Sequence, residues 1–170
     1  MPEYKYANKD RHNYYLNIAE AVLEKATCYR KHYGAVIVKN NEIIATGYNG
    51  APRGRSDCYQ YGKCIRLENK IPRGTRYELC KSVHAEQNAI ISASRKDMIG
   101  STLYLVGIDM DDFNMPYIVN AQPCMMCKKM IINAGISQVI ARNTKDDYTI
   151  YNVDDWLVNM DEMTPDDFGY

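Results

Sequence analysis

The residues best suited to chemistry in this sequence are one histidine and two cysteines, which lie in two short motifs. His84 is followed by Ala85 and Glu86, and the motif Pro123-Cys124-Met125-Met126-Cys127 comes later in the chain. One imidazole and two thiolates are ligands that zinc prefers, and a set of three leaves a fourth position open to water. Glu86 is not needed to complete this set. The sequence therefore predicts a catalytic zinc site at which Glu86 transfers protons.

Helical spacing would bring these side chains to one place. The residues after His84 are predicted to continue as a helix, which puts His84 at the helix N-terminus. Pro123 suits the first position of a second helix, on which Cys124 and Cys127 share a face because they are three residues apart. The positive ends of two helices would then favour thiolate over thiol at the metal.

Other interpretations of these motifs stay open from the residues alone. A Cys-x-x-Cys redox pair needs neither the histidine nor the glutamate, and a closed structural zinc site needs a fourth protein ligand. A zinc-stabilised binding module without turnover would have no use for the Glu86 carboxylate. Glu86 therefore favours the catalytic interpretation over these alternatives.

Length, charge and the number of cysteines limit which classes of protein this sequence could belong to. A length of 170 residues predicts one domain, 1–170, with a core at about 12–142 and an acidic C-terminal extension at 143–170. The 21 basic residues balance the 21 acidic ones, so the charge gives no sign of nucleic acid or a membrane. No apolar run approaches the roughly 20 residues of a membrane span, and the first residues lack the apolar core of a signal peptide. We expect a cytoplasmic location, where six cysteines serve as thiols or metal ligands.

Hydrophobic periodicity and turn residues predict the elements that position the two motifs. The first part of the chain is predicted to form a polar arm at 1–10, a helix from 10 to about 30, and a hairpin of strands 34–39 and 42–47 around Asn40-Asn41. An aperiodic basic segment at 52–81 follows, then a helix at 84–96, a strand at 102–107 and a loop at 108–122 with acids at Asp109, Asp111 and Asp112. The last elements are a helix at 123–134 ended by Gly135, a strand at 137–142, and a short strand and helix in the tail. This order predicts an α/β fold of three layers, α/β/α, with a mixed sheet.

Several motifs together resemble the deoxycytidylate (dCMP) deaminase family, which lies within the cytidine deaminase superfamily. They are Gly34-Ala-Val-Ile-Val, Gly47-Tyr-Asn-Gly-x-Pro-x-Gly, His84-Ala-Glu-Gln-Asn-Ala-Ile, Pro123-Cys-x-x-Cys and Ile132-Asn-Ala-Gly-Ile. The pairing of His-x-Glu with Pro-Cys-x-x-Cys marks zinc-dependent nucleobase deaminases in general, and the Gly-Tyr-Asn-Gly element narrows the resemblance. The chain departs from the family pattern in the long lead into Pro123, at 108–122, and in its acidic tail.

This resemblance implies hydrolytic deamination of dCMP to dUMP and ammonia. His84, Cys124 and Cys127 would hold a zinc ion that lowers the pKa of bound water toward ~7. Glu86 would act as base and then as acid, delivering protons to N3 and to the leaving ammonia. Backbone groups near Ala85 would contact the edge of the base. The resemblance also implies a homo-oligomer.

The resemblance suggests further nucleotide contacts. Asn49 would grip the sugar, although a plain turn asparagine is the alternative. Arg30 and Lys31 are expected to bind the 5′-phosphate, with a solvated helix end as the alternative. Activation by dCTP and inhibition by dTTP would use residues of the Gly-Tyr-Asn-Gly loop and two nearby arginines: Gly47, Tyr48, Asn49, Gly50, Arg53 and Arg55.

The remaining four cysteines suggest a second, structural zinc. Cys28 lies at the end of the first predicted helix, and Cys58, Cys64 and Cys80 fall in the aperiodic segment. A Cys₄ site would tie that segment to the helix. Their spacing is not that of a standard zinc ribbon, so buried thiols without metal are the alternative.

Other substrates are compatible with the same zinc-dependent deamination. Deaminases of other cytosine nucleosides or nucleotides would share the zinc motifs. A nucleic-acid deaminase of the tRNA adenosine type would also carry them, but such an enzyme needs a basic face. The sequence pI of about 6.8 and the acidic tail argue against that substrate.

Overall fold

The computed structural model describes residues 10–110 and 115–160, without the side chains of 158–160. Residues 1–9 of the arm predicted at 1–10, Asp111, Asp112 and the tail beyond residue 160 lie outside the described residues. The single domain over 1–170 stays a prediction. Within the described part, no helix has both the length and the apolar character needed to cross a membrane.

The described chain forms one mixed sheet in the strand order β2-β1-β3-β5-β6, with β4 paired to the end of β3. Only the β3–β5 pair is parallel among these strands. The strands are β1 (Lys31–Lys39), β2 (Glu42–Tyr48), β3 (Thr102–Met110), β4 (Pro116–Val119), β5 (Gln138–Arg142) and β6 (Tyr148–Asn152).

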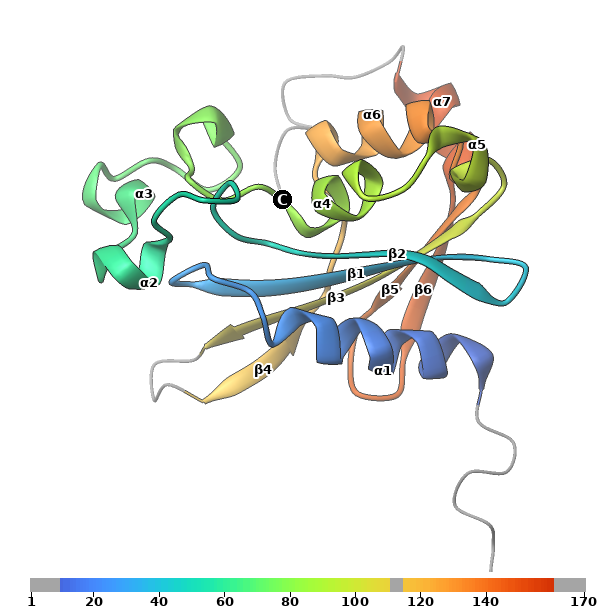
Figure 1. Ribbon diagram of the computed structural model, residues 1–170, viewed down its shortest axis with the longest axis horizontal. Helices are drawn as coiled ribbons and strands as arrows, with labels where there is room; N and C mark the ends of the chain where they lie inside the picture. The colour runs from blue at the N-terminus through green and yellow to red at the C-terminus, as the bar shows by residue number, and fades with distance from the viewer. Residues whose placement is uncertain (1–9, 111–114, 161–170) are drawn as a thin grey trace, which may run out of the picture.

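Helices cover both faces of this sheet, which confirms the predicted three-layer α/β/α fold (Figure 1). One face carries α1 (Arg11–Leu23), and the other carries α4 (Ala85–Ile91), α5 (Arg95–Met98), α6 (Met125–Ala134) and α7 (Val153–Met160). Alternate residues of β1 point to opposite faces of the sheet and pack in two different cores. Ala35 and Ile37 join the core beneath α4 and α6, whereas Val36 and Val38 join the core beneath α1.

The predicted hairpin is confirmed, and β1 begins earlier than expected. Asn40 and Asn41 both have positive φ, 53° and 63°, which is the pattern of a two-residue type I′ turn. Strand β1 starts at Lys31 because Lys31 pairs with Asp109 on β3. The sequence placed Arg30 and Lys31 at the end of the first helix, and the structure does not: Lys31 opens β1. That helix ends at Leu23.

The prediction of a loop across 108–122 is wrong in part. Strand β3 continues to Met110, and β4 returns beside it with Met110 opposite Pro116. A proline lacks the N–H needed inside a sheet, but β4 lies at an edge, where that donor is not required.

The single helix expected at 84–96 is two helices. Strand-facing α4 ends at Ile91, and α5 begins after Ser94, whose hydroxyl accepts a hydrogen bond from the Asp97 N–H at 3.2 Å. Serine competes with the helical hydrogen-bond pattern by capping a new helix. The aperiodic segment likewise contains three short helical turns, α2 (Cys58–Tyr61), α3 (Ile65–Glu68) and η1 (Tyr77–Leu79).

Close contact between α4 and β2 depends on Gly47. A Cβ added at this position would lie 2.3 Å from both the Ala85 carbonyl oxygen and the Ala89 nitrogen. The neighbouring Tyr48 carbonyl accepts a hydrogen bond from Asn88 Nδ2 at 2.8 Å, which joins the same two elements. The glycine that opens the Gly-Tyr-Asn-Gly motif therefore has a packing role: it lets the helix that follows His84 lie directly on the sheet.

We expect Gly47→Ala to lower the free energy of unfolding by about 2–3 kcal/mol, because backbone atoms of α4 must move to admit the methyl group. Gly54→Ala is the control: its Cβ meets nothing within 4 Å, and only the positive φ of 78° opposes it, at a cost of about 1 kcal/mol. Urea unfolding measures both values. Equal losses would contradict the steric explanation.

Candidate active site

The two predicted motifs lie at the N-terminal ends of neighbouring helices on the same face of the sheet. His84 is the N-cap of α4, and its backbone N–H donates to Gln87 Oε1 at 2.9 Å. Cys124 is the N-cap of α6, and its sulfur accepts a hydrogen bond from the Cys127 N–H at 3.4 Å. The expected role of Pro123 is wrong by two positions, since it precedes the N-cap instead of opening the helix.

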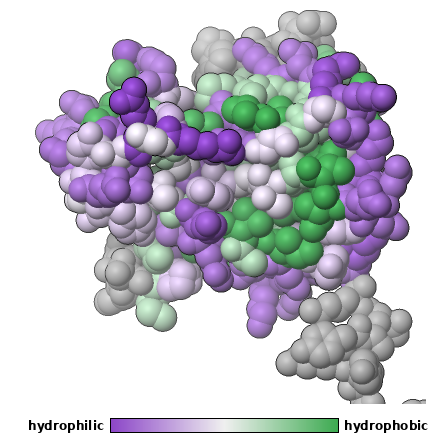
Figure 2. Space-filling model, viewed as in Figure 1, coloured by the Kyte–Doolittle hydropathy of each residue, from purple (hydrophilic) through white to green (hydrophobic). Residues whose placement is uncertain are grey.

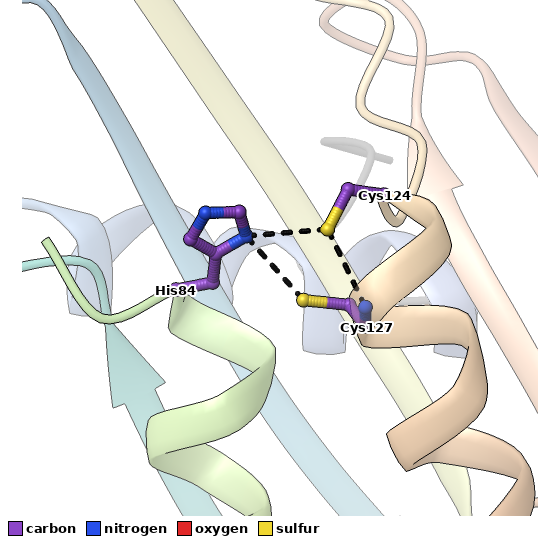
Figure 3. Close-up of side chains that lie close together, drawn as sticks. All are labelled: His84, Cys124 and Cys127. Carbon is purple, nitrogen blue, oxygen red and sulfur yellow. Dashed lines mark hydrogen bonds between the residues drawn. The ribbon is translucent and has the colours of Figure 1, made fainter. Parts of the chain in front are cut away.

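The three side chains converge on one point (Figure 3). His84 Nδ1 lies 3.4 Å from Cys124 Sγ and 3.4 Å from Cys127 Sγ, and all three ligand atoms lie within 4.8 Å of one another. Tetrahedral zinc, with Zn–N of about 2.0–2.1 Å and Zn–S of about 2.3 Å, separates its N and S ligands by roughly 3.5 Å. The donor set and its spacing therefore fit a zinc ion without rearrangement of the backbone.

Burial makes the charged forms of this site costly unless a cation accompanies them. Glu86 is 5% exposed, and burial raises the pKa of its carboxyl, an effect that the nearby His84 opposes. The pKa of Cys127 is raised by its hydrogen bond with Cys124, then by burial and the Glu86 charge. A dication among these groups would lower both pKa values, because it stabilises thiolate and carboxylate directly.

A cavity of about 470 Å³ opens beside this group. Its wall includes His84, Ala85, Glu86 and Cys124, together with three other predicted substrate residues, Arg30, Lys31 and Asn49. Cys127 is fully buried and is not among the residues that line the cavity. The predicted effector residues Gly47, Tyr48, Gly50, Arg53 and Arg55 do not line the cavity, although Gly47 packs against α4 at Ala85.

Asn49 and Lys31 both have structural partners as well. The Asn49 Oδ1 accepts a hydrogen bond from the Tyr33 N–H at 2.7 Å, and its Nδ2 donates to the Lys31 carbonyl at 2.8 Å. One amide hydrogen and one lone pair of Asn49 are then left for a ligand. The Lys31 ammonium lies 3.1 Å from Asp109, so part of its charge is already neutralised.

Sequence reasoning missed several residues of the cavity wall. They are Tyr33, Arg66, Ile71, Arg73, Gly74, Tyr77, Ser82, Asn120 and Gln122. Tyr77 packs edge-on against His84, with ring centroids 5.3 Å apart. The signal available for the arginines was the basic charge of the aperiodic segment, which did not specify which cations face inward.

The other four cysteines lie near one another but not in ligand geometry. Cys58 and Cys64 are buried, and Cys28 and Cys80 are partly buried. Burial is the main cause that raises the pKa of Cys58 and of Cys80, and the charges of the neighbouring cysteines add to it. In the described part of the chain, no three of these sulfurs come within 4.8 Å of one another, unlike the group of His84, Cys124 and Cys127.

The fold and the site define a class: an α/β/α deaminase that presents one histidine, two cysteines and a buried glutamate for zinc-dependent hydrolysis. Residues 9–143 match the family described as the cytidine and deoxycytidylate deaminase zinc-binding region. The chain belongs to this family, as its sequence motifs predicted.

Several individual proteins similar to this chain are deoxycytidylate deaminases. Deoxycytidylate deaminase of Mycobacterium phage D29 is 36% identical over 135 residues, which cover 77% of this chain and 93% of that protein. Deoxycytidylate deaminase of Saccharomyces cerevisiae is 33% identical over 130 residues, which cover 75% of this chain but 36% of the yeast protein. The structure of dCMP deaminase from cyanophage S-TIM5 in complex with dCMP and dUMP is similar, with a TM-score of 0.54 and 27% identity, over 81% of this chain and 85% of the phage chain.

We expect Cys127→Ser to lose one equivalent of zinc per chain relative to the native protein, because a serine hydroxyl stays protonated where a thiolate would bind. Met126→Leu is the matched control, since Met126 lies between the two cysteines and is 39% exposed. Elemental analysis after dialysis measures the difference. Full zinc content in Cys127→Ser would exclude this cysteine as a ligand.

Proposed function

We propose that this protein deaminates dCMP to dUMP and ammonia by hydrolysis. The observation that carries the proposal is the compact group of His84, Cys124 and Cys127 beside the buried Glu86, at a cavity lined by cationic side chains. The structural similarity to a phage dCMP deaminase in complex with dCMP and dUMP supports the choice of nucleotide.

In this proposal, His84, Cys124 and Cys127 hold zinc, and Glu86 moves the protons. When bound, zinc lowers the pKa of a water molecule toward ~7. Glu86 accepts a proton from the attacking water while the water oxygen bonds to C4 of the cytosine ring, and it passes this proton to N3. Glu86 then carries the remaining water proton to the amino group, the C4–N bond breaks, and ammonia leaves. The burial that raises the pKa of Glu86 suits a group that must both accept and donate protons.

Glu86→Ala should keep its zinc and its fold but lose about 10²–10⁴ in kcat, the usual range for removal of a general acid–base. Glu86→Gln tests the same point with nearly unchanged volume. Stopped-time assays of dUMP formation, with zinc content measured in the same samples, separate chemistry from metal loss. Near-native turnover by a zinc-replete variant would remove Glu86 from the mechanism.

The substrate panel that tests the function compares dCMP, dCTP, deoxycytidine and cytidine, followed by loss of the cytosine absorbance. Faster deamination of dCMP supports the proposal, and preference for a nucleoside would transfer the function to a cytidine deaminase. Turnover of structured RNA alone would indicate a nucleic-acid deaminase. Binding of dCMP without turnover would indicate a non-catalytic module.

We also propose a homo-oligomeric, cytoplasmic enzyme regulated by dCTP as activator and dTTP as inhibitor. The exposed Arg53 and Arg55 lie close in sequence to the Gly-Tyr-Asn-Gly element and outside the substrate cavity, which supports a separate effector site. The six free cysteines suit a reducing compartment. Adding each triphosphate to the dCMP assay tests the regulation.

We propose, finally, that Cys28, Cys58, Cys64 and Cys80 bind a structural zinc after a small adjustment of their loops. Their mutual proximity and burial support this site. Two zinc ions per chain are expected by elemental analysis, and Cys58→Ser should lose one of them while it keeps the ion needed for activity. One zinc per chain, with the metal content and Tm of Cys58→Ser unchanged, would show that these thiols bind no metal.

A further inference from the structure

The substrate cavity has more positive than negative charge on its wall. Four cationic residues line it, Arg30, Lys31, Arg66 and Arg73, and the single acid among its lining residues in the described chain is Glu86. Figure 2 shows that the lobe formed by the segment of α2 and α3, which supplies Arg66 and leads to Arg73, has a largely hydrophilic surface. A cavity with this balance attracts anions.

Two of these four cations are already committed to partners. Lys31 forms the ion pair with Asp109 at 3.1 Å. Arg66 is 8% exposed, and its guanidinium donates to the carbonyl oxygens of Pro72 and Arg76, each at 2.9 Å. The same guanidinium lies over the ring of Tyr77, 5.0 Å from its centroid. Arg66 thus acts as an internal brace of the segment and has little capacity left for a ligand.

In contrast to Lys31 and Arg66, Arg73 is positioned by its backbone turn and not by side-chain partners among the described residues. It lies in the turn between Pro72 and Thr75, which is closed by hydrogen bonds from the Thr75 N–H (3.4 Å) and hydroxyl (3.0 Å) to the Pro72 carbonyl. Arg66 donates to that carbonyl as well, so a buried guanidinium fixes the turn. Across the described residues, the exposed Arg73 side chain makes no hydrogen bond and no ion pair. The turn therefore presents a free guanidinium at the cavity.

Tyr33 connects Arg73 to the reactive end of the cavity. Its ring lies across Gly107 on the neighbouring strand, where a Cβ would come within 2.4 Å of Tyr33 Cε1. The pKa of the Tyr33 hydroxyl is raised to about 12, first by burial and then by the Glu86 charge, and the Arg73 charge opposes this rise. One hydroxyl thus senses both charges, which places Glu86 and Arg73 on the same chamber.

We propose that Arg73 binds the phosphate of the nucleotide substrate, and that Arg66 is the positioning residue that holds its turn. This inference rests on the proposed function. A guanidinium donates two parallel hydrogen bonds to a phosphate, which the compact ammonium of lysine does not reproduce. With Glu86 at one part of the chamber and Arg73 at another, a ligand that carries both a base and a phosphate fits better than a nucleoside. Arg73 then contributes to selectivity for the nucleotide, together with Arg30, the other cavity cation whose side chain has no hydrogen bond or ion pair among the described residues.

The test compares the dissociation constants of dUMP and deoxyuridine by calorimetry, since their ratio isolates the contribution of the phosphate. Arg73→Gln should reduce this ratio by about 10- to 150-fold, the value of a hydrogen bond to a charged group, with binding of deoxyuridine unchanged. Arg73→Lys should fall between native and Arg73→Gln. Arg76→Gln is the matched control, because Arg76 is on the same segment, pairs with Glu78 and does not line the cavity.

Kinetics with dCMP complete the design. Arg73→Gln should raise KM for dCMP with little change in kcat, and Arg66→Lys should raise the same KM through the loosened turn. In the double variant the two effects should not add, since both act on one contact. A ratio in Arg73→Gln equal to that of Arg76→Gln, or an equal loss for dUMP and deoxyuridine, would overturn the inference. Failure of the native protein to deaminate dCMP would instead count against the proposed function.

Discussion

The structure depends on the meeting of two helix N-termini above one sheet. The imidazole of His84 and the thiols of Cys124 and Cys127 reach ligand spacing only because α4 and α6 lie side by side on the same face. Residues distant from the metal group maintain that arrangement. Gly47 lets α4 rest against β2, and the buried Ile131 and Ala134 fix α6 in the core.

The same arrangement places groups that prefer water in an apolar setting. Cys127 is fully buried and Glu86 nearly so. Burial of an ionised group without compensation is costly, and burial is the main cause that raises the pKa of Glu86. The pKa of Cys127 is raised first by its hydrogen bond with Cys124 and then by burial. Zinc binding and folding are therefore coupled: the ion stabilises the folded site, and the folded site holds the ligands in place.

The segment between residues 52 and 81 supplies part of the cavity wall, including Arg66, Arg73 and Tyr77. It has few apolar residues to anchor it, and polar contacts do much of that work. The Arg66 guanidinium organises the turn at 72–76, and the Lys81 ammonium lies 3.2 Å from the centroid of the Tyr61 ring. Contacts of this kind are directional, so they hold a loop in a defined shape with little hydrophobic burial.

Local rules explain what the sequence by itself determined. The i, i+3 spacing of Cys124 and Cys127, the position of His84 just before its helix, and the Asn40-Asn41 turn all depend on neighbours within a few residues. The chemistry of the site and the hairpin were therefore predictable, and the order of helices and strands was enough to predict the three layers.

Long-range contacts decided the rest. The register of β1 on β3 pairs Lys31 with Asp109 and turns Tyr33 toward the chamber, and no local pattern specifies that register. Strand β4 exists because the chain returns to the edge of β3. Sequence reasoning assigned 108–122 to a loop and did not recognise the apolar run Tyr117-Ile118-Val119 within it as a strand. The choice between Arg66 as an internal brace and Arg73 as a free cation depends on which carbonyl groups lie near each guanidinium. Only the packed tertiary structure decides which arginine has such partners, because residue type and sequence spacing do not distinguish Arg66 from Arg73.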